Sequence, residues 1–175
     1  MRRLRMIVAL GALLSMLGGV VTAAPALAGR GPKWSIGPPT PFTFPAQYCG
    51  FPVLVTPVVN GEYTKILKAA DGFTTYLFTG PFSASLTNVQ TGKTITEKMN
   101  GPGKFFGNPD GSFTEVHTGL NGPFPLAPAD AQRFGLPPGL IVTVGKLTFS
   151  IGANGTFTSL TLNGHVAVDL CAALG

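Results

Sequence analysis

Hydrophobic and polar residues alternate along most of the chain after Cys49, which is the pattern of β-strands that bury one face. The segments 82–87 and 140–151 show the alternation most clearly. Ten such runs can be distinguished, from which we expect about eight strands. The runs are 51–55, 63–67, 73–79, 82–87, 93–99, 104–106, 112–118, 140–151, 156–162 and 166–170.

Short turn sequences separate these runs. Asn60-Gly61 and Asp71-Gly72 readily take the positive φ angles of tight hairpin turns, so successive strands are expected to pair antiparallel. A sheet of this size leaves exposed edges unless it closes on itself. We therefore predict an all-β, antiparallel up-and-down barrel, with a two-sheet β-sandwich as the alternative.

One segment, 119–139, interrupts the rhythm with five prolines and is predicted to be a long loop. Residues 128–135 are compatible with one or two helical turns, since a proline comes early and a glycine follows the last turn. Phe124 and Phe134 are placed to cover one mouth of the barrel. The segment is then either a mobile lid over a ligand or a permanent plug of the core.

The first residues have the order of a secretory signal. Arg2, Arg3 and Arg5 precede an uncharged apolar stretch that ends in small residues at Ala28. We predict a signal peptide over 1–28, cleavage after Ala28, and a secreted, extracellular protein; a retained membrane anchor is the alternative.

The proline-rich residues 29–48 are predicted to be a surface tail, because proline favours extended conformations without ladder hydrogen bonds. Residues 49–175 are then expected to form a single domain. Removing the leader also changes the charge: three of the 12 basic residues and none of the 7 acidic ones lie in it, which leaves 9 − 7 = +2. The remaining lysines are scattered, so we expect neither a nucleic-acid partner nor membrane association after cleavage.

Cys49 and Cys171 are the 2 cysteines of the chain. An even pair in an exported protein predicts a disulfide, with two unpaired buried thiols as the alternative. The bond would close a loop of 171 − 49 = 122 residues and contribute roughly 4–5 kcal/mol in the chain-entropy model.

Four local strings carry a resemblance when taken together: Cys49–Val53, Thr87–Thr94, Pro109–Ser112 and Asp169–Leu174. In this order the chain resembles an uncharacterised family of secreted actinomycete proteins, over essentially 49–174. The resemblance implies a bacterial, secreted origin. It supplies no activity, ligand or catalytic residue.

Polar chemistry is sparse. Glu115 and His117 lie two apart in one predicted strand, and His165 and Asp169 lie four apart in another, so each pair shares a face. Such residues can bind a divalent metal or perform acid–base work, but as ordinary solvated strand residues they do neither. We assign no catalytic residue, no metal site and no cofactor.

Several aromatic residues are candidates for lining an apolar pocket, with simple filling of the interior as the alternative. These candidates are Tyr76, Phe78, Phe82, Phe105, Phe149 and Phe157. The leading hypothesis is a non-catalytic binding or interaction module whose partner is a small apolar ligand or an extracellular protein. One alternative is a barrel carrier of a small apolar ligand, and a second is a small barrel enzyme that acts on an apolar substrate.

Overall fold

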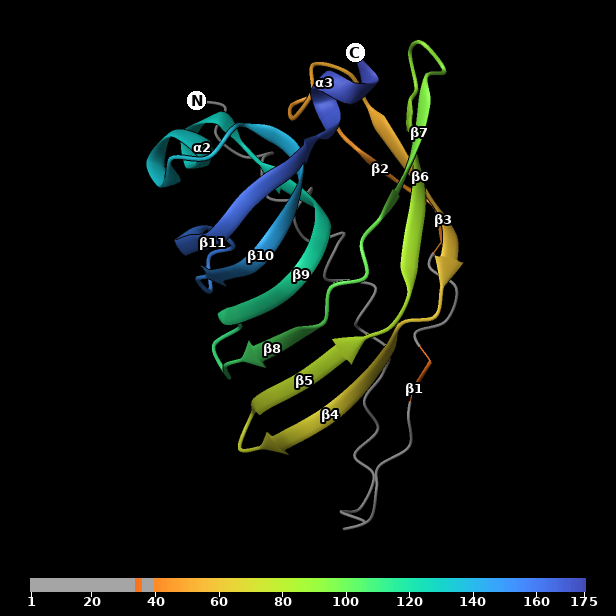
Figure 1. The fold of residues 1–175 in the computed structure, drawn as a ribbon. Helices are drawn as coiled ribbons and strands as arrows, with labels where there is room; N and C mark the ends of the chain where they lie inside the picture. Colours follow the sequence, from red (N-terminus) through yellow and green to blue (C-terminus); the bar gives the residue numbers. More distant parts are fainter. Residues whose placement is uncertain (1–33, 36–39) are drawn as a thin grey trace, which may run out of the picture. The chain divides into compact units, whose positions relative to one another are not determined.

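Two antiparallel β-sheets make up the described part of the chain, as the computed structural model shows (Figure 1). The description covers residues 34–35 and 40–175, which belong to one unit, Lys33–Gly175. The predicted signal peptide, its cleavage site at Ala28, and residues 29–33 and 36–39 of the predicted tail lie outside the described residues.

The larger sheet has seven strands, and all neighbouring pairs in it are antiparallel. In spatial order they are β1 (Trp34–Ser35), β4 (Tyr63–Ala70), β5 (Phe73–Thr79), β8 (Gly103–Gly107), β9 (Phe113–Leu126), β10 (Gly139–Ile151) and β11 (Phe157–Asp169). The smaller sheet has four strands, which in spatial order are β2 (Phe42–Phe44), β3 (Val53–Asn60), β6 (Phe82–Asn88) and β7 (Thr94–Lys98).

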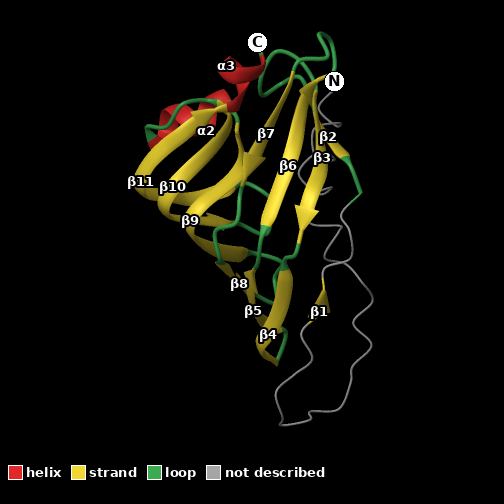
Figure 2. Ribbon diagram, turned by 45° about the vertical axis from the view of Figure 1, so that its right-hand side comes forward, coloured by secondary structure: helices red, strands yellow, loops and turns green. Residues whose placement is uncertain are grey.

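Two short helices, α2 (Pro128–Phe134) and α3 (Leu170–Leu174), lie near the same end of the strands (Figure 2). Among the described residues, no helix is long and apolar enough to cross a membrane. Gly135 ends α2 in the left-handed conformation, with φ 67°, as the predicted proline-to-glycine pattern requires. Asp169 caps α3, because its side chain accepts a hydrogen bond from the backbone N–H of Ala172.

The all-β, antiparallel prediction is confirmed, but the expected up-and-down barrel is wrong, because the sheets do not close. The arrangement instead fits the two-sheet alternative. The cause is a change of sheet at Asn60-Gly61, which we predicted to be a hairpin turn. There β3 pairs with β6 in the smaller sheet, whereas β4, which follows directly, pairs with β5 in the larger sheet.

The chain returns to the smaller sheet at Gly80, directly beside the first crossing. Gly61 N–H donates a hydrogen bond to the carbonyl oxygen of Pro81 at 2.8 Å. A Cβ atom on Gly80 would clash with the carbonyl oxygen of Gly61. The two chain segments can therefore cross between the sheets in contact only because these positions carry no side chain.

Hydrophobic side chains form two cores, one on each face of β10. The first core lies between the smaller sheet, β10 and α3, and contains Phe44, Val53, Val55, Ala84, Leu86, Met99, Leu140, Val142, Leu170 and Leu174. The second core lies between α2 and strands β9 to β11, and contains Phe113, Phe124, Leu126, Ala131, Ile141, Leu147, Phe149, Ile151 and Leu160. Because Leu140 and Ile141 point to opposite cores, the first part of β10 is buried on both faces.

The segment 119–139 is not the predicted long loop. Strand β9 continues through it to Leu126, and α2 fills most of the remainder. The strand accommodates Pro123 because the pairing register with β10 shifts between Ile141 and Thr143, opposite this proline. Phe124 is only 9% exposed and belongs to the second core, so it is part of the packed body rather than of a lid.

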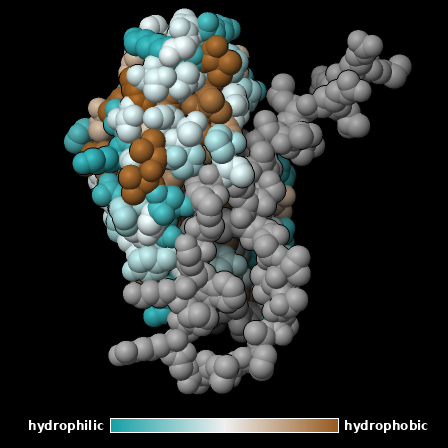
Figure 3. All heavy atoms as spheres, turned by 90° about the vertical axis from the view of Figure 1, so that its right-hand side faces the viewer, coloured by the Kyte–Doolittle hydropathy of each residue, from teal (hydrophilic) through white to brown (hydrophobic). Residues whose placement is uncertain are grey.

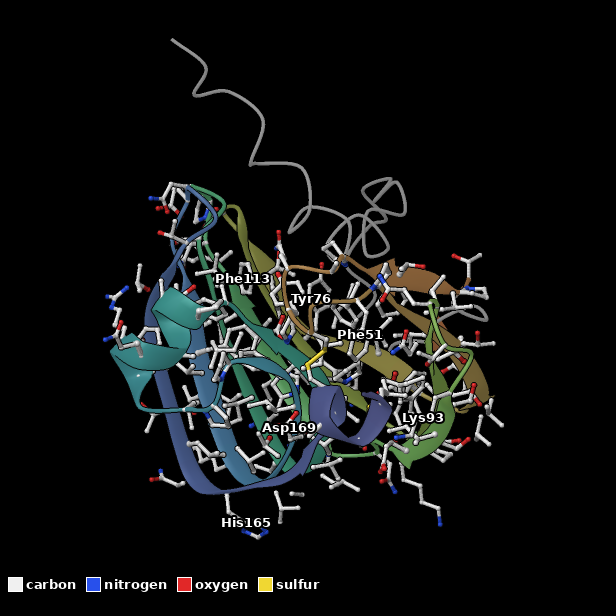
Figure 4. All side chains as sticks on the ribbon, turned by 90° about the horizontal axis from the view of Figure 1, so that it is seen from above. Phe51, Tyr76, Lys93, Phe113, His165 and Asp169 are labelled. Carbon is white, nitrogen blue, oxygen red and sulfur yellow. A yellow bond between two sulfur atoms is a disulfide. The ribbon has the colours of Figure 1, made fainter. Side chains whose placement is uncertain are left out.

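Part of the predicted surface tail also belongs to the body. Residues Phe42–Phe44 pair with β3 as strand β2, and Phe44 is buried in the first core. The disulfide prediction is confirmed: Cys49 is bonded to Cys171, with their Cα atoms 5.0 Å apart (Figure 4). The bond joins the segment before β3 to α3, and thus ties the two ends of the fold together.

Candidate binding site on the aromatic face

One face of the larger sheet gathers most of its aromatic side chains, and we call it the aromatic face. Residues two apart in a strand share a face, and directly paired residues of neighbouring strands do so too. Tyr76 pairs with Phe105, and Phe105 pairs with Glu115, which in turn pairs with Phe149. The rings of this face come from β5, β8, β9, β10 and β11 and are Tyr76, Phe78, Phe105, Phe113, Phe124, Phe149 and Phe157.

The rings contact one another in a continuous series. The ring centroids of Tyr76 and Phe105 are 5.6 Å apart, those of Phe105 and Phe113 are 5.1 Å apart and stacked, and those of Phe113 and Phe149 are 6.4 Å apart. These separations are typical of favourable aromatic pairs. Phe113 and Phe149 are buried, whereas Tyr76 and Phe105 remain partly exposed. The series therefore runs from a packed core to an accessible surface.

Helix α2 covers the buried end of this series. The Phe157 ring lies 5.9 Å from Phe149 and 6.3 Å from Phe134 of α2. Arg133 donates a hydrogen bond to the carbonyl oxygen of Phe157 at 2.9 Å, which fixes α2 to the edge strand β11. The predicted lid residue Phe134 thus packs on the second core, and the open part of the aromatic face lies at β5 and β8.

A polar pair interrupts the rings on β9. His117 Nε2–H donates a hydrogen bond to Glu115 Oε2 at 2.7 Å, and the two side chains are 19% and 18% exposed. Glu115 and His117 are therefore not solvated like ordinary exposed strand residues, which was one of the alternatives considered from the sequence. They form a mostly buried hydrogen-bonded pair within an aromatic surface.

The imidazole of His117 is held between two rings. It stacks on Phe149 at 5.8 Å with an interplanar angle of 15°, and meets Phe78 edge-on at 5.2 Å. Gly103, which pairs with both His117 and Phe78, makes the second contact possible. A Cβ atom on Gly103 would clash with the Phe78 ring. The ring can therefore extend across β8 towards His117 only because a glycine lies beneath it.

Glu62, just before β4, and Thr64, within β4, add further polar groups to the aromatic face. Thr64 pairs with Phe78, so it lies on the aromatic face, and Glu62 is close enough to His117 for their charges to interact. Burial raises the pKa of the Glu62 carboxyl above its usual value, while the nearby charge of His117 acts in the opposite direction. Thr64 Oγ1 is buried, and no group in the described part of the chain hydrogen-bonds to it.

The second predicted polar pair lies elsewhere. His165 is exposed and points outward, away from Tyr76 and Phe113 (Figure 4). Asp169 is used as the cap of α3. Across residues 34–35 and 40–175, no group of three or more His, Cys, Asp or Glu side chains is arranged to hold a metal ion.

Five of the six predicted lining residues lie on the aromatic face: Tyr76, Phe78, Phe105, Phe149 and Phe157. Phe82 does not, because it follows the second sheet crossing and packs against the first core from β6. Glu62, Thr64 and Phe113 also lie at this face and were not among the site residues predicted from the sequence. Phe113 was detectable from its alternation with Glu115, but no local signal marks the other two.

The surface of the smaller sheet differs from the aromatic face in how its hydrophobic side chains are distributed. On the side that carries β3, β6 and β7, hydrophobic side chains lie in small groups between hydrophilic ones in the described part of the surface (Figure 3).

No protein-family model, curated protein or solved structure matches this chain. The site is therefore interpreted from its own geometry.

Proposed function

We propose that this protein is a secreted, non-catalytic binding protein that takes a small, largely apolar molecule on the aromatic face. The observation that supports this most is the ring series from Phe149 to Tyr76, which starts in the core and ends at partly exposed rings. Ligand sites in proteins are mostly apolar and aromatic, with a few fixed polar groups that orient the ligand. Glu115 and His117 are such groups, held by each other and by the rings around them.

Secretion is supported by the disulfide and by the leader sequence. A disulfide that joins residues 122 apart is typical of proteins that fold in an oxidising compartment. The basic, apolar and small-residue order of residues 1–28 is that of an export signal. The resemblance to secreted actinomycete proteins stays a prediction in the same direction.

The test uses two adjacent phenylalanines that point to opposite faces of β8. Phe105 belongs to the aromatic face, whereas Phe106 is 40% exposed on the other face. The probe is the neutral fluorescent compound N-phenyl-1-naphthylamine. Phe105→Ala should weaken its binding about tenfold, which corresponds to roughly 1.4 kcal/mol of lost ring contact. Phe106→Ala is the matched control and should leave the affinity unchanged. Equal effects of the two variants, or no binding by the wild-type protein, would contradict the proposal.

A second candidate function is acid–base catalysis, which the hydrogen-bonded Glu115–His117 pair favours. A carboxylate that orients an imidazole is a common general-base arrangement. Ligand recovered from the native protein distinguishes the two functions. Recovery of one compound that stays unchanged when it is incubated with the protein supports binding. Conversion of that compound by the wild-type protein, but not by His117→Ala, would establish catalysis.

A further inference from the structure

The two faces of the larger sheet carry opposite charges. Lys65 pairs with Leu77, and Leu77 pairs with Lys104, so both lysines lie on the face opposite to Tyr76 and Phe78. Lys146 lies on that same face, because it alternates with Leu147 of the second core. All three lysines are exposed. The aromatic face instead carries the carboxylates of Glu62 and Glu115, together with the imidazole of His117.

These charges do not cancel on the aromatic face. Even a protonated His117 supplies one positive charge against two carboxylates. Arg133, the basic residue of α2, directs its guanidinium to the carbonyl oxygens of Phe157 and Thr158 at the far, covered end of the face. Among the described residues, the accessible part of the face therefore carries more acidic than basic groups, although the chain as a whole has a formal net charge of +5.

The remaining polar group of this face lacks a hydrogen-bond partner among the described residues. Thr64 Oγ1 is buried without a hydrogen-bond partner among the described residues, and it lies in the same cross-strand row as Phe78 and His117. A buried hydroxyl without a partner costs free energy that a hydrogen bond with a ligand can recover. The ionised carboxylates only accept hydrogen bonds and the hydroxyl oxygen can also accept, so a ligand that donates hydrogen bonds can satisfy all of these groups.

Aromatic ring faces add a second preference for positive charge. Ring quadrupoles attract ammonium groups, and the attraction strengthens where water is excluded. The partly exposed rings of Tyr76, Phe78 and Phe105 lie beside the acidic groups. We infer that the ligand of the aromatic face is an organic amine: an apolar body that carries a cationic ammonium group held by Glu62 and Glu115. This inference rests on the proposed function and names its ligand class.

The experiment compares three compounds with the same apolar body: 4-phenylbutylamine, 4-phenylbutanol and 4-phenylbutanoate. Their affinities are measured by calorimetry at neutral pH and low salt, at up to about 10 mM ligand, so that even millimolar binding is detected. The amine should bind at least about tenfold more tightly than the alcohol, and the carboxylate should bind most weakly. Added salt should weaken amine binding and leave alcohol binding unchanged, because salt screens only the charged contact.

Substitutions of single glutamates identify the carboxylates that bind the ammonium group. Glu62→Gln and Glu115→Gln should each lower the amine affinity about fivefold to tenfold without changing that of the alcohol. Glu97→Gln, in β7 of the smaller sheet, is the charge-matched control and should have no effect. If a variant fails to fold, the salt dependence of the wild-type protein still tests the inference.

The outcomes separate the two proposals. Equal affinities for amine and alcohol, or an amine affinity insensitive to salt and to both glutamate variants, would overturn the amine inference and leave the apolar site intact. Tighter binding of the carboxylate would do the same and would direct attention to the lysine-bearing face. Failure of all three compounds to bind would reject the proposed function together with the inference.

Discussion

At the scale of single residues, the site depends on polar side chains that lie among aromatic rings and are partly removed from water. Glu62 is a carboxylate in a largely desolvated place, which raises its pKa. His117 lies between Phe78 and Phe149, and its orientation is set by Glu115 at 2.7 Å. Burial of the Glu62 carboxylate costs free energy, and the presence of this polar group beside Glu115 and His117 on an aromatic surface is the reason to interpret that surface as a binding site.

The raised pKa of Glu62 predicts how stability depends on pH. The folded protein binds the Glu62 proton more tightly than the unfolded chain, whose usual carboxyl pKa is 4.5. Stability from this group is therefore present below that value and is lost as the pH rises through the higher pKa of the folded state. Glu62→Gln removes the ionisation. The variant should gain stability over the wild type as the pH rises from 4 towards 7, as measured by urea unfolding at each pH. A stability difference that stays constant over this range would contradict the assignment.

At the scale of strands and turns, the sequence predicts which residues form strands better than it predicts which strands pair. Asn60-Gly61 has the composition of a hairpin turn, yet it is a crossing between sheets. The difference is made by Gly80 and Pro81, about twenty residues away, which lie against it. Local composition does not contain that contact.

The same limit explains which site residues were predicted. Alternation within a strand is local, so it correctly placed Glu115 and His117 on one face. Phe82 shows the same alternation, but the crossing at Gly80 moves it to the other sheet. Glu62 was missed because its place beside His117 depends on the crossing between β3 and β4 and on the pairing of β4, β5, β8 and β9. The site could be predicted where it follows strand periodicity and not where it follows topology.

Strand β9 gives the clearest prediction at this scale, because half of it was expected to be a loop. Phe124, at 9% exposure, should cost about 3–5 kcal/mol when replaced by alanine, since a cavity remains in the second core. Phe134 of α2 is only partly buried, so Phe134→Ala should cost less, about 1–2 kcal/mol. Urea unfolding of both variants measures these differences. A larger loss for Phe134 than for Phe124 would show that α2 carries more of the core than its packing indicates.

At the scale of the whole described unit, the disulfide and the two cores hold the sheets together. The first core joins the smaller sheet to β10 and α3, and the second joins α2 to β9, β10 and β11. Cys49–Cys171 spans the first of these junctions. The aromatic face begins in the second core and continues past it to β5 and β8, so its accessible part is supported by packed residues.

Removal of the disulfide should therefore lower stability without changing the fold at low temperature. Opening a loop of 122 residues releases roughly 4–5 kcal/mol of constraint on the unfolded chain. Reduced protein, or the double variant Cys49→Ser with Cys171→Ser, should melt at a lower temperature while its circular dichroism spectrum at low temperature is kept. Loss of the β-sheet signal on reduction, even in the cold, would show that the bond acts on the folded state instead.

The most direct test of binding on the aromatic face is an NMR measurement of intermolecular nuclear Overhauser effects with bound 4-phenylbutanol. The neutral compound tests the location of the site independently of ligand charge. We expect cross-peaks from the ligand to the ring protons of Tyr76, Phe105 and His117. Cross-peaks to Phe73 and Phe106 instead, which are 49% and 40% exposed on the opposite face, would contradict it.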